Sequence, residues 1–288
     1  MFPDSYSPGS SSKYTRRFPN EEDLDSDRLH ERKLGMKLLV FPHSHFCEKA
    51  RWALDAKGIP FQPVPILPGF HIIHVRRYAP KTSVPVLLND DEVIQGAGEI
   101  IDYLDMRFPE SPLTPTDAEA RRTCLAIESS MDERLGEDLR QILYSGLLAY
   151  PDFIRFCFTF PMSTFRKSVF FLSYPFLRRV IHGQYVFSIE AVEETKDRFR
   201  HTMDELAEHL KGRKYFVGDH FSRADLSIAS MLSLLVRPPE HTLPWREFPD
   251  PQTRVFAESY ERHPVTLWVR EIYRTHRNKP QSGVSTRR

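Results

Sequence analysis

Cysteine is scarce in this sequence. The chain of 288 residues has three, Cys47, Cys124 and Cys157, and they lie far apart. An odd and widely spaced set argues against a disulfide framework and is typical of proteins kept in a reducing compartment. We therefore expect a cytoplasmic protein.

An excess of one charge and long apolar runs are also missing. Forty Lys and Arg residues oppose 39 Asp and Glu residues, so the formal net charge is +1. This balance gives no reason to expect a nucleic-acid partner. No run of about 18 uncharged apolar residues is present and the N-terminus lacks an apolar signal core, so neither a membrane span nor export is predicted.

One segment, residues 153–187, is rich in phenylalanine. Five Lys and Arg residues interrupt it, and we expect Pro161 and Pro175 to break it into short helices. We interpret it as the wall of an apolar pocket, with an interfacial membrane contact or ordinary core as the alternatives. A membrane is therefore not expected as a partner.

The whole chain is 40% hydrophobic, which suffices for one large domain or, as we prefer, two modest ones. Residues 1–35 and 277–288 are interpreted as disordered tails. Between them, apolar runs and turn residues predict an α/β domain at 36–108 of order βαβαββα. Its strands are expected at 37–41, 61–66, 84–88 and within "EVI", with helices at 46–57 and from Ala97. A short helical or irregular piece is expected from His71 to Tyr78.

Three prolines in residues 107–117, "RFPESPLTPTD", predict a linker at 109–116. The rest, 117–276, has helical periodicity. Residues 192–211 carry one apolar stripe, and residues 225–236 are apolar almost all round, which predicts a central buried helix. Ser222 and Asp225 have the spacing of a capping box at its start.

Four stretches carry a family resemblance: "SHFCEKARWAL", "SVPVLL", "IIDYLD" and "FVGDHFSRADLSIASML". In this order, with the proline linker and a helical second domain, they resemble the cytosolic glutathione transferase superfamily over about residues 36 to 275. The resemblance implies a thioredoxin-like α/β domain followed by an all-α domain. It does not assign the class within the superfamily.

Ser44 falls where this family has its catalytic serine or cysteine. A helix N-terminus offers unpaired amides and partial positive charge, which favour a thiolate, and a hydroxyl there can donate to the glutathione sulfur. Cys47 is a second catalytic candidate, as the fourth position of Ser-x-x-Cys. Because it shares a helical stripe with Ala50 and Leu54, a buried inert thiol is favoured over a redox role.

His43 and His45 flank Ser44. Polarising the hydroxyl or binding a carboxylate of glutathione is one interpretation of them, and ordinary surface histidines are the other. Together with Cys47 they match no zinc spacing and offer too few ligands, so no metal is expected.

Val84-Pro85 resembles the cis-proline step of the thioredoxin-like fold. The family pairs the backbone of the preceding residue with the cysteinyl part of glutathione, and an ordinary trans proline is the alternative.

The residues at the start of the helix expected from Ala97 differ from the family's pattern. The family has an acidic residue or Gln followed by Ser at these positions. This chain has Gly96 and Ala97 there, with Gln95 one place early, so binding of the γ-glutamyl carboxylate is expected to be weaker but not lost.

The other binding candidates follow from the family's pattern. His71 and Lys81, within the basic stretch "HIIHVRRYAPK", are candidates for the glycyl carboxylate, although a solvated basic face explains the stretch equally well. The apolar pocket for a second substrate is expected from bulky aromatic residues of the helical domain: Tyr144, Tyr150, Phe153, Phe156 and Phe160.

The resemblance implies a homodimeric enzyme that activates glutathione for attack on an apolar electrophile or for thiol transfer, and thus a role in detoxification. Its partners would be glutathione and a hydrophobic small molecule. The alternative is a catalytically weak protein of the same fold that carries apolar ligands or binds other proteins. Gly96 and Ala97 are the reason to keep that alternative.

Overall fold

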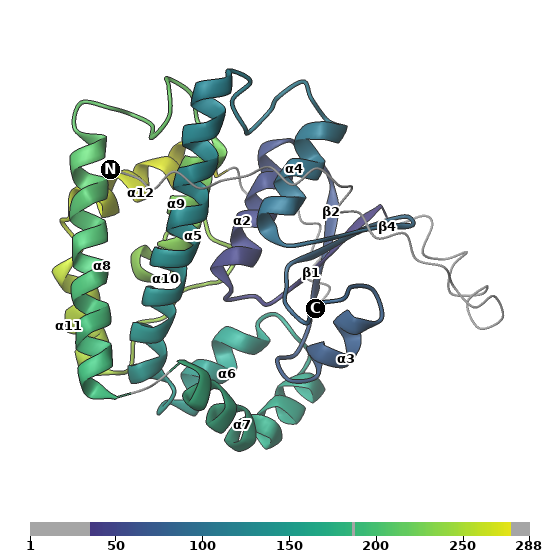
Figure 1. The fold of residues 1–288 in the computed structure, drawn as a ribbon. Helices are drawn as coiled ribbons and strands as arrows, with labels where there is room; N and C mark the ends of the chain where they lie inside the picture. Colours follow the sequence, from purple (N-terminus) through teal and green to yellow (C-terminus); the bar gives the residue numbers. More distant parts are fainter. Residues whose placement is uncertain (1–34, 186–187, 278–288) are drawn as a thin grey trace.

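A small sheet and a large group of helices lie side by side in the computed structural model, which describes residues 35–185 and 188–277 (Figure 1). The first part of the chain has the predicted order βαβαββα. Its elements are β1 (Met36–Val40), α2 (His45–Ala56), β2 (Phe61–Pro65), α3 (His71–Arg76), β3 (Val86–Asn89), β4 (Glu92–Gln95) and α4 (Ala97–Arg107).

The four strands form a mixed sheet in the order β2-β1-β3-β4. β1 and β2 are parallel because α2 connects them as a crossover, and β3 is antiparallel to both β1 and β4. Alternate side chains of β1 point to opposite faces. Leu38 and Val40 pack into the main core with α2 and α4, whereas Leu39 packs into a second cluster with Val75 of α3.

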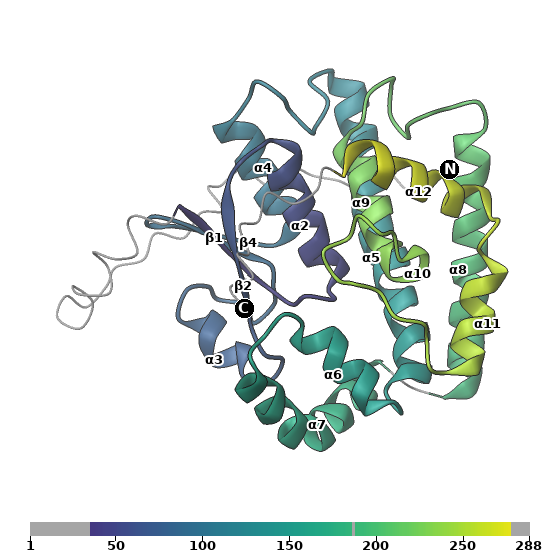
Figure 2. The ribbon, with the colours of Figure 1, turned by 180° about the vertical axis from the view of Figure 1, so that it is seen from behind.

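The second part of the chain is helical, so the predicted fold class is confirmed. Its elements are α5 (Ala118–Leu147), α6 (Pro151–Thr159), α7 (Thr164–Tyr185), α8 (Ile189–Leu210), α9 (Arg223–Met231), α10 (Ser233–Val236), α11 (Pro251–Ser259) and α12 (Pro264–His276). The predicted linker at 109–116 falls between α4 and α5. Seen from behind, α9 lies deep among the other helices (Figure 2), and each of its residues is buried.

The predicted capping box of α9 is present. The Ser222 amide and hydroxyl both donate to the Asp225 carboxylate, at 2.9 and 2.8 Å. The single helix predicted at 225–236 is wrong, however, because it divides into α9 and α10. Leu232 between them has a ψ of −2°, which interrupts the helical ladder. The apolar side chains continue through this residue, so the hydrophobic pattern carries no sign of the break.

The predicted break at Pro175 is also wrong, since α7 continues through this residue. One face of α7 is buried on both sides of the proline, through Phe170, Tyr174, Leu177 and Ile181. The Tyr174 hydroxyl also donates to the Leu148 carbonyl at 2.8 Å. These contacts offset the lost backbone hydrogen bond, because packing rather than propensity supplies most helix stability.

Arg277, which the sequence assigns to the C-terminal tail, is buried. Its guanidinium pairs with the Glu48 carboxylate at 2.8 Å and with Asp55. Burial alone would raise the pKa of Glu48, but Arg277, His241 and Arg51 together lower it to about 2. Apart from Gly35 and Arg277, the expected tails lie outside the described residues.

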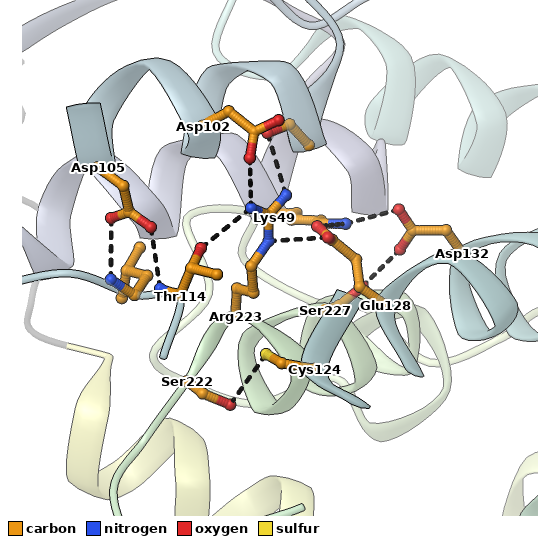
Figure 3. A network of polar contacts seen from close by, with 12 residues as sticks. Lys49, Asp102, Asp105, Thr114, Cys124, Glu128, Asp132, Ser222, Arg223 and Ser227 are labelled. Atoms are coloured by element: carbon orange, nitrogen blue, oxygen red, sulfur yellow. Dashed lines mark hydrogen bonds and ion pairs between the residues drawn. The ribbon is translucent and has the colours of Figure 1, made fainter. Parts of the chain in front are cut away.

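A network of buried charges joins the two parts of the fold (Figure 3). Arg223 of α9 pairs with Asp102 of α4 at 2.6 Å and with Glu128 of α5 at 2.8 Å. Lys49 of α2 pairs with the same Glu128 at 2.7 Å and with Asp132 at 2.6 Å. Although burial opposes it, the two cations lower the pKa of Glu128. These pairs therefore connect α2 and α4 directly to α5 and α9.

Replacing Arg223 with alanine should destabilise the protein by about 3 to 5 kcal/mol, because Glu128 and Asp102 lose a cation and Glu128 stays buried. Urea unfolding measures this change. Arg200→Ala is the matched control: Arg200 pairs with Asp197 on the surface, where the loss should be about 1 kcal/mol or less. Equal losses in both variants would contradict a structural role for the network.

Candidate functional site

A cavity of about 850 Å³ lies between the α/β part and the helical part of the fold. The loop after β1, the loop before β3 and the start of α4 form one side of it. Residues of α5, α6 and α7 form the other side. A volume of this size is typical of sites for small molecules.

Ser44 lines this cavity at the N-terminus of α2. As the N-cap residue it has extended backbone angles, and its Oγ accepts the Cys47 amide at 3.3 Å. Because the oxygen serves as an acceptor, its proton can be donated to a ligand. A hydroxyl and the positive end of a helix therefore meet at one point of the cavity.

Cys47 does not line the cavity. Its thiol is fully buried in the core, where the Phe41 amide contacts the sulfur at 3.4 Å. Burial raises the pKa of Cys47, and this outweighs the opposing effects of Arg51 and Ser44. The thiol is therefore protonated at neutral pH, in agreement with the inert interpretation.

Neither flanking histidine is exposed: His45 is buried and His43 is partly buried. His43 lines the cavity and stacks on Phe158 with ring centroids 3.7 Å apart. Burial, assisted by the positive charge of Arg140, lowers the pKa of His43 to about 3. His45 is 3% exposed, and burial holds its pKa well below the usual range as well. Both rings are thus neutral at pH 7.

Among residues 35–185 and 188–277, no group of three or more His, Cys, Asp or Glu side chains is arranged to hold a metal ion.

The Val84-Pro85 peptide bond is cis, as the resemblance implies, and both residues line the cavity. Gln95 lines it too, but its side-chain amide is engaged. It donates to the carbonyls of Lys81 and Ser83 at 2.9 and 2.8 Å, and its oxygen accepts the Lys81 amide. Gln95 therefore holds the loop that precedes Val84.

Gly96 and Ala97 begin α4 at the wall of the cavity. Gly96 has a φ of +111°, a backbone angle that residues with side chains rarely adopt, which explains why glycine occupies this position. The Glu99 carboxylate lies against it. No side chain caps α4. Its first amides therefore lack a side-chain partner and form a potential anion site together with the positive end of the helix.

Two of the basic side chains of this stretch line the cavity, those of His71 and Lys81. The His71 Nδ1 accepts the Gly69 amide at 2.9 Å, and its ring meets Phe41 edge-on. Arg76 and Arg77 are exposed and lie outside the lining. The structure thus brings only part of this stretch to the cavity.

Only some of the aromatic candidates for the substrate pocket line the cavity. Tyr144 and Phe153 line the cavity, whereas Tyr150 lines a second one of about 480 Å³. Phe156 and Phe160 pack against each other and lie outside both linings. Choosing aromatic residues by type alone overlooked that α6 turns only one face toward the cavity.

Sequence reasoning missed several lining residues, among them Arg140, Cys157, Phe158 and Tyr185. Arg140 donates to the Tyr185 hydroxyl at 2.8 Å and pairs with Glu137. It lies four residues before Tyr144, one helical turn away on the same face, so its spacing could have identified it. Burial raises the pKa of Cys157 to about 12, so this thiol is protonated at neutral pH.

The neutral histidines predict that stability falls as the pH drops below about 6.5. Below this pH the histidines of the unfolded chain become protonated, whereas His43 in the folded protein stays neutral because its pKa is about 3. His43 alone should remove about 2 kcal/mol of stability at about pH 5. Urea unfolding at neutral pH and at about pH 5 tests this. His43→Phe keeps the stacking and should reduce the fall, and an identical fall in this variant would contradict the assignment.

Two family models match the chain. The model described as "Glutathione S-transferase, N-terminal domain" matches residues 38–112, and "Glutathione S-transferase, C-terminal domain" matches residues 189–254. The first covers the sheet with α2 and α4, and the second covers α8, α9 and α10. Both matches follow the order of the two parts described above.

Curated relatives match shorter stretches. Glutathione S-transferase 1 of Dianthus caryophyllus is 32% identical over 122 residues, which is 36% of this chain and 55% of that protein. Glutathione S-transferase Z1 of Arabidopsis thaliana is 35% identical over 89 residues, 30% of this chain and 40% of that protein. The chain thus spans about half or less of the length of these relatives.

Solved structures match over more of the chain. A rice glutathione S-transferase in complex with glutathione covers 84% of this chain and 88% of its own, with a TM-score of 0.58 at 17% identity. One from Ceriporiopsis subvermispora, also with glutathione, covers 83% and 95%, with a TM-score of 0.55 at 16% identity. At this identity the likeness concerns the fold.

The family models and the architecture agree in domain order and in fold. The chain belongs to the cytosolic glutathione S-transferase superfamily.

Proposed function

We propose that this protein binds glutathione in the cavity between its two parts and activates the thiol for transfer to an apolar electrophile. One observation carries the proposal. The N-terminus of α2 with Ser44, the residue before the cis-proline and the uncapped start of α4 all line the same cavity. The first of these features can bind the sulfur of glutathione, the second can pair with its backbone, and the third can bind a carboxylate.

The γ-glutamyl carboxylate would bind the first amides of α4, at Ala97 and Gly98, beside the positive end of the helix. Ala97 supplies no hydroxyl, so this anchor lacks one charge-assisted hydrogen bond of about 1.5 to 3 kcal/mol. The backbone of Val84 would pair with the cysteinyl part. His71 and Lys81 are proposed to hold the glycyl carboxylate at the other end.

The thiol would then lie beside Ser44. Its hydroxyl donates to the sulfur, and the positive end of α2 stabilises the thiolate. Arg140 adds positive charge from the α5 side of the cavity, close enough to lower the pKa of both histidines that flank Ser44. His43 is too weak a base to take the thiol proton, since its pKa is about 3. The proton therefore leaves to solvent and hydrogen bonding holds the anion.

The electrophile would bind against the apolar wall of α6 and α7. Phe153 and Phe158 come from α6, and Leu177 and Ile181 come from α7. The thiolate forms a carbon–sulfur bond there, and the leaving group departs with the electron pair of the bond that breaks. Thiol transfer would use the same geometry, with a disulfide in place of the carbon electrophile.

A second function, carriage of apolar ligands or binding of other proteins without efficient catalysis, is favoured by one observation. The Glu99 carboxylate lies over Gly96, at the wall where the γ-glutamyl carboxylate would bind. Like charges there weaken binding. A homodimer in the cytoplasm remains part of our proposal for either function, supported by family membership.

Calorimetric titration of glutathione into the full chain, with Ser44→Ala and Cys47→Ala as variants, tests the function. We expect binding at millimolar concentration or tighter in all three proteins. The ultraviolet absorbance of the bound thiolate should disappear only in Ser44→Ala, because this variant alone loses the donor to the sulfur.

Cys47→Ala is the matched control, since it removes a sulfur from the same helix without changing the cavity lining. Loss of the thiolate absorbance in Cys47→Ala alone would mean that Cys47, and not Ser44, activates the thiol. No binding of glutathione by the unaltered protein would contradict the enzyme and favour the carrier.

A further inference from the structure

Helix α7 carries apolar side chains on two opposite faces. Phe170, Tyr174, Leu177 and Ile181 form the buried face. Phe165, Leu172, Phe176 and Val180 follow the spacing i, i+7, i+11 and i+15, so they form a second stripe. Leu177 and Ile181 of the first face line the cavity, and so does Val180 at the end of the second stripe, but Phe165, Leu172 and Phe176 do not.

The second stripe is open to solvent. Leu172 is 81% exposed, Phe165 77% and Phe176 75%. Isolated exposed apolar residues are common on proteins, but a continuous stripe of large ones marks an interaction site.

The stripe continues onto α3. Both ribbon views show α3 beside α7 (Figures 1 and 2), and the Arg166 guanidinium donates at 3.1 Å to the carbonyl of Pro65, the last residue of β2. Phe70 and Ile73 of this region are 52% and 67% exposed. We call the exposed side chains of residues 70–77 and of α7 the α3–α7 face.

The charged side chains of the α3–α7 face are all basic. Residues 56–89 and 153–189 contain no Asp or Glu, although the whole chain is almost neutral. The cations of the face are Arg76, Arg77, Arg166, Lys167, Arg178 and Arg179. Within the described part of the chain, no carboxylate forms an ion pair with any of them. Elsewhere exposed cations such as Arg200 and Arg274 pair with an acid three residues away.

This charge pattern selects between two occupants. A second copy of the chain, meeting the same face by two-fold symmetry, would bring these cations together, and residues 56–89 and 153–189 supply no acid to neutralise them. An anionic lipid surface would neutralise these cations and accept aromatic and aliphatic side chains at the boundary between headgroups and acyl chains.

We propose that the α3–α7 face docks on anionic membranes, with α7 lying in the plane of the interface. Phe165, Leu172 and Phe176 would enter the boundary region, and the flanking arginines and lysine would pair with lipid phosphates. No described helix is both long and apolar enough to cross a bilayer. The sequence alone did not favour membrane contact, because it does not show that α7 has a second, uncovered face.

The cavity opens next to this face. Ile72 of α3 and Val180 of α7 are exposed on the face and also line the cavity. If the proposed function holds, the apolar substrate would be one that partitions into lipid and enters from the bilayer. The docking itself does not depend on glutathione.

Co-sedimentation of the full chain with vesicles tests the docking without glutathione. Vesicles of neutral phosphatidylcholine are compared with vesicles that also contain anionic phosphatidylglycerol. Binding is expected only to the anionic vesicles and should weaken as salt is added. The double variant Leu172→Glu with Phe176→Glu should bind at least about tenfold more weakly, because two apolar anchors are lost.

Val255→Glu is the matched control, since Val255 is 66% exposed on α11, away from the face. It should bind like the unaltered protein, and thermal melting should show that both variants fold. Absence of binding at any lipid composition, or equal binding by the double variant, would overturn the proposal. So would a dimer that the double variant splits without any vesicle binding, because the face would then be an interface between two copies.

Discussion

The buried charges around Glu128 are the constraint on which the rest of the structure depends. Lys49 and Arg223 approach this carboxylate from different helices, and both cations are inaccessible to solvent. Because any shift between α2 and α5 would leave buried charge unpaired, the network fixes the walls of the cavity relative to each other. Glu128 and Arg223 also line one end of the cavity, while α6 and α7 make the other end apolar. This change from a charged end to an apolar end suits a charged peptide such as glutathione at the first and a hydrophobic second substrate at the other.

Local patterns explain what could be predicted from the sequence. The order of strands and helices, the capping box at Ser222 and the position of Ser44 at a helix start each depend on residues close together in the chain. The missed features depend on long-range packing. Arg277 pairs with Glu48 from 229 residues away, and Pro175 is tolerated because the helix around it is packed. Arg140 could be recognised as a lining residue only from the helical face that it shares with Tyr144, not from its residue type.

Two unusual features of the sequence follow from geometry. Gly96, which replaces the polar residue typical of the family, has a positive φ that favours glycine. The phenylalanines of α6 and α7 serve different surfaces: Phe153 and Phe158 of α6 line the cavity, whereas Phe165 and Phe176 of α7 are exposed. A composition count cannot separate these surfaces, whereas helical spacing in the folded chain can.

The most direct measurement is a crystal structure of the full chain with glutathione bound. We predict the glutathione sulfur within hydrogen-bonding distance of the Ser44 Oγ, the cysteinyl backbone against Val84 and the γ-glutamyl carboxylate at the amides of Ala97 and Gly98. Glutathione bound with its sulfur away from Ser44, or outside the cavity between the two domains, would contradict our assignment of the site.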